Sequence, residues 1–197
     1  MKTAILAALV TSAAAFAPAQ TGKASSALQE SVFDNYVGAV DFRGKEMKWD
    51  PLNLSETYSP FQGFFREAEL RHGRTAMLAV VGFIATDFVR IPGEAYSFET
   101  ISKTADAHDL LFASGPMYNL LFWIGLFDLV ITAPAIQAMS NGDREAGDFG
   151  WTKFAPTDKA KFDKKRESEL MNGRLAMMAV GGIATQSIIT GHGFPYV

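Results

Sequence analysis

Two pairs of charged residues recur in apolar surroundings, and they are the residues of this chain best suited to chemistry. A seventeen-residue segment at 66–82, REAELRHGRTAMLAVVG, returns one hundred positions later at 166–182 as RESELMNGRLAMMAVGG. Eleven positions are identical, and each copy keeps one glutamate and one arginine in its apolar stretch: Glu69 and Arg74, Glu169 and Arg174. Because a charge buried among apolar groups is costly unless it is paired, these four side chains need partners.

The spacing of the charges predicts how they pair. Five residues along a helix place Glu69 and Arg74 about 140° apart around the axis, which is too far for a good pair within one helix. Two symmetric helices that cross at this point would pair the charges reciprocally: Glu69 with Arg174, and Glu169 with Arg74. The glycine between the charges in each copy permits the close backbone approach that such a crossing needs.

A neutral Lewis base follows each glutamate. His72 and Asn172 lie three residues after Glu69 and Glu169, on nearly the same helix face. Each offers a lone pair beside a carboxylate whose charge an arginine offsets. Such groups suit a magnesium ion whose plane is filled by a porphyrin-type ring. A purely structural ion pair is the alternative.

A di-iron carboxylate site is a second alternative. It needs two Glu-x-x-His motifs and two further helical glutamates. Here the second copy reads Glu-x-x-Asn, and the middle apolar block offers only Asp128 as an acid. The ligands are too few, which disfavours this alternative.

Composition narrows the class of protein. Hydrophobic residues make up 48% of the 197 positions, sixteen of them Phe, which is apolar for a soluble domain. A formal net charge of −3 argues against a strongly basic nucleic-acid binder. The chain has no Cys, which excludes disulfides, zinc-thiolate sites and thiol nucleophiles. No nucleophile and base are arranged together, and no glycine loop suits phosphate, so we do not expect an enzyme.

Three long apolar blocks predict an all-α membrane protein with three transmembrane helices. We expect them at about 60–88, 116–139 and 158–190, each with about 20 residues able to cross the hydrocarbon core. The repeat makes the first and third a symmetric crossed pair, and the second lies outside it as a peripheral helix. Pro134 should distort the last turns of the second helix.

The N-terminus has the character of a targeting segment. A charged start and a short apolar run over about 1–15 are followed by an Ala- and Ser-rich stretch without acids before Glu30. We therefore expect a plastid-targeting presequence over 1–30 and one domain over 31–197, with plain secretion as the alternative. Twelve Lys and Arg residues lie over 16–66 and 140–166, against two between the first two helices, which places the N-terminus on the positive side of the membrane.

The repeated segments and several loops resemble those of the chlorophyll-binding light-harvesting superfamily. ELRHGRTAMLAV and ELMNGRLAMMAV are similar to its first and third helix motifs. GDFGW at 147–151, RIPGE at 90–94 and the AFAP junction at 15–18 resemble the fucoxanthin–chlorophyll a/c proteins of diatoms and related algae. The resemblance covers nearly the whole chain and implies a plastid thylakoid location with a stromal N-terminus.

The resemblance also implies a set of pigment sites. The implied axial ligands of chlorophyll magnesium are Glu69, His72, Glu169, Asn172, Gln186, Asn119 and Asp128, with Arg74 and Arg174 as charge partners. His192 is a further candidate ligand. The loops over 49–60 and 147–158 are similar to segments that hold xanthophyll head groups.

The function implied is that of an antenna scaffold. Its cofactors would be chlorophyll a, chlorophyll c, fucoxanthin and other xanthophylls. Its partners would be a photosystem core, other antenna subunits and thylakoid lipids. A photoprotective relative that dissipates energy as heat is the alternative, and acids such as Glu94 and Asp106 in the first loop keep it open. A pigment-carrier or assembly protein is a third class.

Overall fold

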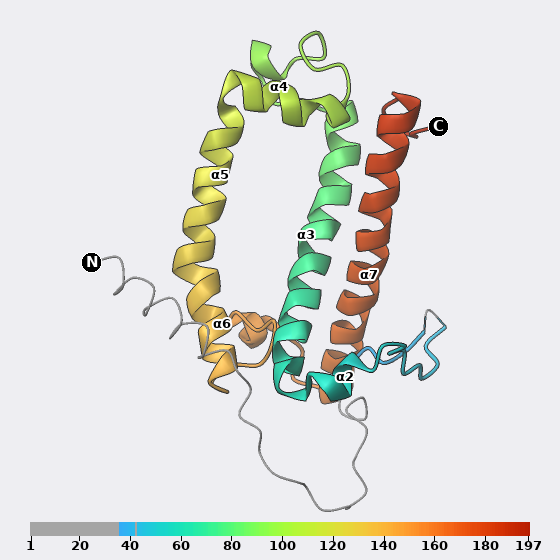
Figure 1. Cartoon of the computed structure of the whole chain (residues 1–197), viewed down its shortest axis with the longest axis vertical. Coiled ribbons are helices and arrows are strands. Elements are labelled where there is room, and N and C mark those ends of the chain that lie inside the picture. The colour runs from blue at the N-terminus through green and yellow to red at the C-terminus, as the bar shows by residue number, and fades with distance from the viewer. Residues whose placement is uncertain (1–35, 42) are drawn as a thin grey trace, which may run out of the picture.

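Helices dominate the architecture of the chain. The computed structural model describes residues 36–41 and 43–197, and the presequence predicted over 1–30 lies outside them. Within that described part, the β pairing is one isolated bridge between Val40 and Glu46. Two long helices stand side by side, and a third helical rod stands apart from them over most of its length (Figure 1).

The two long helices are α3 (Gln62–Phe88) and α7 (Lys159–Thr190), and they contain the two copies of the repeat. They come closest at Gly73 and Gly173, where a Cβ added to either glycine would lie 3.0 Å from the Cα of the other. Any side chain there would push the helices apart. The buried apolar residues of this interface come in repeat-related pairs: Leu70 with Leu170, and Ala76 with Ala176.

Short elements lead into these helices. The helix α2 (Leu54–Thr57) and a 3₁₀ turn, η2 (Ser59–Phe61), precede α3. A 3₁₀ turn, η6 (Trp151–Phe154), precedes α7. The carboxylate of Asp158 caps α7 by accepting a hydrogen bond from the Ala160 amide at 3.1 Å.

The middle apolar block is a continuous but irregular rod. It consists of α5 (Pro116–Phe127), a π turn η5 (Asp128–Thr132) and α6 (Ala133–Ser140). Pro134 lies in the first turn of α6 and has no amide hydrogen to donate to the carbonyl four residues earlier. The π turn falls where that hydrogen bond is missing, so the distortion expected from Pro134 is present just before the proline.

Asp87, near the end of α3, forms hydrogen bonds with two segments that are distant in the sequence, the connection to α5 and the C-terminal tail. Its carboxylate accepts hydrogen bonds from the amide and hydroxyl of Thr104 at 3.2 and 2.6 Å, and from the Phe194 amide at 2.9 Å. The connection that leads through η3 (Glu94–Tyr96), η4 (Thr104–Asp106) and α4 (Ala107–Ser114) is thereby held with the C-terminal tail. Burial and the Asp87 carboxylate raise the pKa of Tyr196 to about 12.

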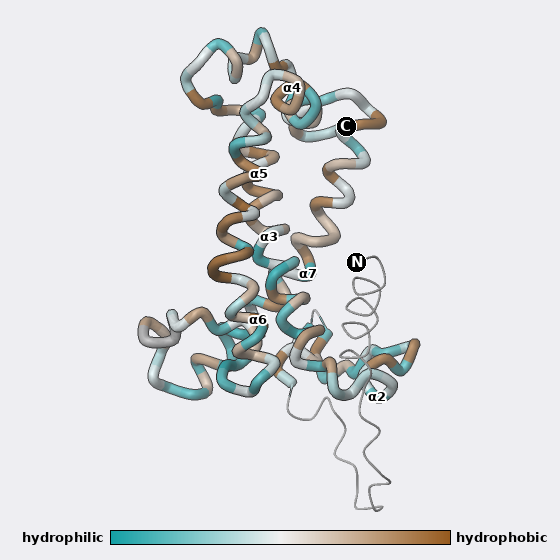
Figure 2. The backbone as a smooth tube through the Cα atoms, turned by 60° about the vertical axis from the view of Figure 1, so that its left-hand side comes forward, coloured by the Kyte–Doolittle hydropathy of each residue, from teal (hydrophilic) through white to brown (hydrophobic). Residues whose placement is uncertain are grey.

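The apolar surface is distributed unevenly. Among the described residues, the one helical segment long and apolar enough to cross a membrane by length and composition is Pro116–Ser140. Its apolar side chains are mostly exposed, and brown, hydrophobic positions recur along α5 between paler ones (Figure 2). In α3 and α7 the repeated charges interrupt the apolar sequence, which lowers their hydropathy.

Candidate functional site

The centre of the candidate site is a pair of ion pairs between α3 and α7. Nε of Arg174 donates to Oε1 of Glu69 at 2.8 Å, and Nε of Arg74 donates to Oε1 of Glu169 at 2.7 Å. The reciprocal pairing predicted from the repeat is therefore present. Each pair joins the two helices on either side of the glycine contact.

Each of these arginines also fastens a loop. Arg74 donates through Nη1 to the Gly147 carbonyl at 2.9 Å, and Arg174 donates in the same way to the Gly38 carbonyl at 2.7 Å. Both glycines have positive φ, and a Cβ on either would collide with a leucine of the repeat, Leu70 or Leu170. The internal symmetry thus extends beyond the seventeen residues into the segments before the helices, which the sequence reading missed.

The two glutamates differ in the partner of their second carboxylate oxygen, Oε2. Nη1 of Arg66 donates to Oε2 of Glu69 at 2.8 Å, so Glu69 lies between two guanidinium groups. The equivalent Arg166 instead lies 3.4 Å from a carboxylate oxygen of Glu145. Within the part of the chain that the structure describes, Glu169 has one cationic partner where Glu69 has two.

His72 and Asn172 are exposed, with their donors used locally. Nδ1 of His72 lies 2.7 Å from the Ala68 carbonyl, which can only accept, so Nδ1 is the donor and Nε2 is the nitrogen with a lone pair in the neutral ring. Nδ2 of Asn172 donates to the Ser168 carbonyl at 2.8 Å, which leaves the side-chain Oδ1 outward. Both residues present a neutral acceptor on the outer face of the crossing helices.

The remaining candidates lie away from the crossing. Gln186 is exposed on α7, and Asn119 is exposed on α5. Asp128 is in an ion pair with Arg71 and accepts a hydrogen bond from the Thr132 hydroxyl at 3.0 Å. Nδ1 of His192 lies 2.9 Å from the Val197 carbonyl in the tail.

Sequence reasoning missed two contacts that hold the surroundings of the site. Glu67 is 2% exposed, lies 2.9 Å from Nη2 of Arg144 and accepts a hydrogen bond from the Gly147 amide at 2.6 Å. Its identity with Glu167 in the repeat was a signal of importance. The second contact is the pair of Arg71 and Asp128, for which the only signal was that Arg71 differs from Met171.

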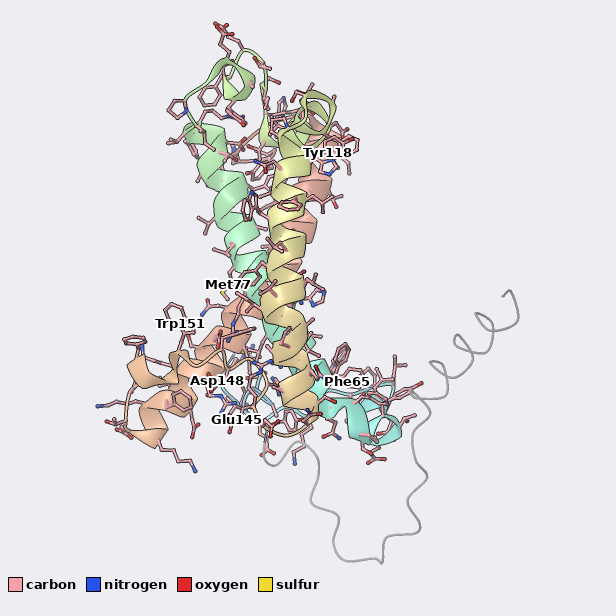
Figure 3. All side chains as sticks on the ribbon, turned by 90° about the vertical axis from the view of Figure 1, so that its left-hand side faces the viewer. Phe65, Met77, Tyr118, Glu145, Asp148 and Trp151 are labelled. Atoms are coloured by element: carbon pink, nitrogen blue, oxygen red, sulfur yellow. The ribbon has the colours of Figure 1, made fainter. Side chains whose placement is uncertain are left out.

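A cavity of about 700 Å³ opens beside the ion pairs. Its lining combines charged and aromatic side chains of α3, α7 and the loop before α7, among them Arg66, Glu169, Asp148, Phe149, Trp151 and Phe162. Glu145, Asp148 and Trp151 gather at the end of the molecule where α7 begins, far from Tyr118 on α5 (Figure 3). Over 36–41 and 43–197, no three His, Asp or Glu side chains are grouped as a metal centre would need.

Comparisons with known proteins show the family of this chain. The model of the family described as chlorophyll A-B binding protein matches residues 33–188. The fucoxanthin-chlorophyll a-c binding proteins C and D of Phaeodactylum tricornutum are 35% and 36% identical, each over 91% of this chain and 92% of their own length. The fucoxanthin-chlorophyll a-c binding protein of Chattonella marina var. antiqua is 31% identical over 96% of this chain and 88% of its own length.

Proposed function

The chain belongs to the chlorophyll a-b binding protein family, and from this premise we propose that it is a light-harvesting antenna protein. It binds chlorophylls and carotenoids in a membrane and passes excitation energy to a photosystem. The family is one of pigment-binding proteins rather than enzymes, in accord with the expectation from the sequence.

The observation that carries the proposal is the chemistry of the α3–α7 crossing. The charges of Glu69 and Glu169 are each offset by an arginine of the opposite helix, so a carboxylate oxygen can serve as a ligand without leaving an uncompensated negative charge at membrane depth. His72 and Asn172 each direct a donor at their own helix and keep an acceptor outward. These four residues would hold chlorophyll by supplying oxygen or nitrogen ligands to its magnesium.

Three further ligands complete the proposed set with less support from their surroundings. Gln186 and Asn119 are exposed and polar on otherwise apolar helix faces. Asp128 has its charge offset by Arg71, as the two glutamates have theirs offset by Arg174 and Arg74. This shared arrangement supports Asp128 as a ligand.

The pigments follow from the relatives. Proteins named fucoxanthin-chlorophyll a-c binding match over more than nine-tenths of the chain, which supports chlorophyll a, chlorophyll c and fucoxanthin as the cofactors. Bound pigments absorb light and pass excitation to one another. The protein's part is to fix their positions, through the ligands above, and to tune their energies through local charge. The loops over 49–60 and 147–158 would hold xanthophyll head groups beside the crossing.

We propose that α3, the rod Pro116–Ser140 and α7 all cross the thylakoid membrane. The start of α3, the end of α6 and the start of α7 lie at one end of the molecule (Figure 1). Lys and Arg residues of the described chain concentrate in the segments at this end, which supports the proposal that it faces the stroma. Residues 1–30 would be the plastid presequence and 31–197 the mature pigment-binding domain.

Protease added to stroma-side-out thylakoids tests this orientation. Cleavage of the basic loop between Ser140 and Arg166 is expected. Cleavage confined to 90–114 would reverse the orientation.

The function is tested on the purified native complex by fluorescence excitation. Antenna function requires that chlorophyll c and carotenoid absorption bands appear in the excitation spectrum of chlorophyll a emission with high yield. Absence of those bands contradicts light harvesting. A strongly shortened emission lifetime on acidification would instead identify the photoprotective relative.

A further inference from the structure

One stripe of α3 is directed at the middle helical rod. Gly63, Glu67 and Arg71 are four residues apart and therefore share a helix face. A Cβ on Gly63 would lie 3.1 Å from the Met139 sulfur, and Arg71 pairs with Asp128. This stripe is separate from the face that packs on α7.

Between those two contacts, Glu67 pairs with Arg144, which follows the end of the rod. Glu67 lies 2.9 Å from Nη2 of Arg144, whose Nε donates to the carbonyl of Ala135 in α6 at 3.0 Å. The stripe thus meets successive parts of the segment 128–144. Its contact farthest along α3 is the ion pair of Arg71 with Asp128.

Beyond Asp128, the rod leaves α3. Over residues 116–127 of α5, no ion pair or side-chain hydrogen bond reaches α3 in the described chain, and α5 stands apart from α3 (Figure 1). The Arg71–Asp128 pair is therefore the last polar contact before the two helices separate. A change in this contact would therefore alter the direction in which α5 diverges from α3.

The repeat shows that this contact breaks the internal symmetry. The position of α7 equivalent to Arg71 is Met171, which carries no charge. The positions equivalent to Gly63 and Glu67 are Asp163 and Glu167, which are acids. Because α3 offers a cation to Asp128 and the equivalent stripe of α7 does not, the acid at the start of the π turn can be paired by α3 alone.

The π turn contributes to the geometry of this pair. Asp128 begins η5, and the Thr132 hydroxyl within the same turn donates to its Oδ1 at 3.0 Å. The same oxygen receives the guanidinium of Arg71. A π turn changes the angular register of a helix and is often found at functional positions. The irregularity before Pro134 thus fixes the Asp128 carboxylate between its own helix and α3.

We propose that Arg71 is a positioning residue of the antenna. Its ion pair with Asp128 selects α3 over α7 as the neighbour of the middle rod and sets the separation between α5 and α3. Its relevance to energy transfer rests on the proposed function, because that separation fixes how far pigments on Asn119 and Asp128 lie from those of the crossing.

The chain contains no Cys, so spin labels can be placed at two engineered cysteines without background. Leu78 on α3 and Leu121 on α5 are 76% and 66% exposed and suit Leu78→Cys with Leu121→Cys. Double electron–electron resonance on the pigment-loaded protein in lipid would give one narrow distance. Arg71→Met, which installs the residue found at position 171, is expected to lengthen and broaden that distance.

Three controls accompany this measurement. Met171→Leu should leave the distance unchanged, and Arg71→Lys should keep it close to that of the parent protein. Labels at Leu78→Cys with Leu175→Cys, which report on α3 and α7, should not respond to Arg71→Met. An unchanged α3–α5 distance in Arg71→Met overturns the proposal.

If Arg71→Met does not assemble, Arg71→Lys decides, because it keeps the cation and leaves Asp128 in place. Assembly of Arg71→Lys with the narrow distance of the parent protein supports the ion pair, and failure of Arg71→Lys to assemble overturns it. The distance is independent of energy transfer, so the two proposals can fail separately. If Arg71→Met lengthens the distance, but chlorophyll c and carotenoid bands are absent from the excitation spectrum of chlorophyll a emission, the antenna function alone is contradicted. If those bands are present and Arg71→Met leaves the distance unchanged, the positioning role alone is contradicted.

Discussion

The two crossing helices share eleven of seventeen residues over the repeat, yet their glutamates have different surroundings. In each copy, an arginine of the opposite helix donates to Oε1 of the glutamate and to the carbonyl of a loop glycine. The two copies differ at the second carboxylate oxygen, Oε2. Arg66 binds Glu69, whereas Arg166 turns away from Glu169 toward Glu145.

One loop residue accounts for this difference. Tyr36 precedes Gly38 by two residues, and Glu145 precedes Gly147 by two, so they occupy equivalent places in the two halves. Arg66 lies over the ring of Tyr36, 4.8 Å from its centroid, and its Nη1 remains available to Glu69. The carboxylate of Glu145 draws Arg166 to itself. Two helices related by the repeat can therefore hold their glutamates in different surroundings when a neighbouring loop differs by one charge.

The largest expected effect comes from removing the inner arginines. Among the described residues, Arg74→Leu leaves Glu169 without a cationic partner, whereas Arg174→Leu leaves Glu69 with Arg66. Removing one partner of a buried ion pair costs about 3–5 kcal/mol in soluble proteins, and for these half-buried pairs the cost should be smaller. We expect Arg74→Leu to lose most assembled complex and the α7 pigment, and Arg174→Leu to lose clearly less. The yield of assembled complex and its pigment stoichiometry after reconstitution measure the effect of each variant. Equal losses would show that Arg66 does not compensate for the loss of Arg174 at Glu69.

An intermediate effect is expected from the neutral ligands. His72→Leu and Asn172→Leu fill a similar volume and strand no charge. Each should therefore remove one chlorophyll and leave helicity and the thermal midpoint nearly unchanged. Pigment stoichiometry with circular dichroism measures this outcome. Unchanged stoichiometry in either variant would remove that residue from the ligand set, and Thr75→Leu on the exposed side of α3 is a matched control.

The smallest effect is expected from exchanging the loop residue. Glu145→Tyr should free Arg166 to bind Glu169, so that both glutamates lie between two cations. A carboxylate shared by two cations is the weaker donor, and the pigment on α7 should then be lost in detergent as readily as the pigment on α3. The rates of pigment loss from the parent protein and the variant measure this. Equal rates in the parent protein would mean that the second arginine has no effect on ligand strength.

The helices and the central pairing were predictable from the sequence. The apolar blocks lie where α3, α5 to α6, and α7 are found, because hydropathy and the glycine and proline positions are local properties. The pairing of Glu69 with Arg174 followed from the angle between Glu69 and Arg74 on one helix and from the repeat. The roles of Arg71, Glu67 and Arg144 could not be found in this way, since their partners lie in the middle rod or in the loop behind it, far along the chain.

The sequence by itself therefore determined the elements of this protein and the reciprocal charges at their crossing. Helical periodicity and the cost of an unpaired charge act on each repeat in the same way, so one copy predicts the other. The tertiary structure alone decided which of several similar ions meet. Arg66 and Arg166 are identical residues at equivalent positions of the repeat, and whether Arg166 meets Glu169 or Glu145 depends on distances between segments that the chain order leaves open.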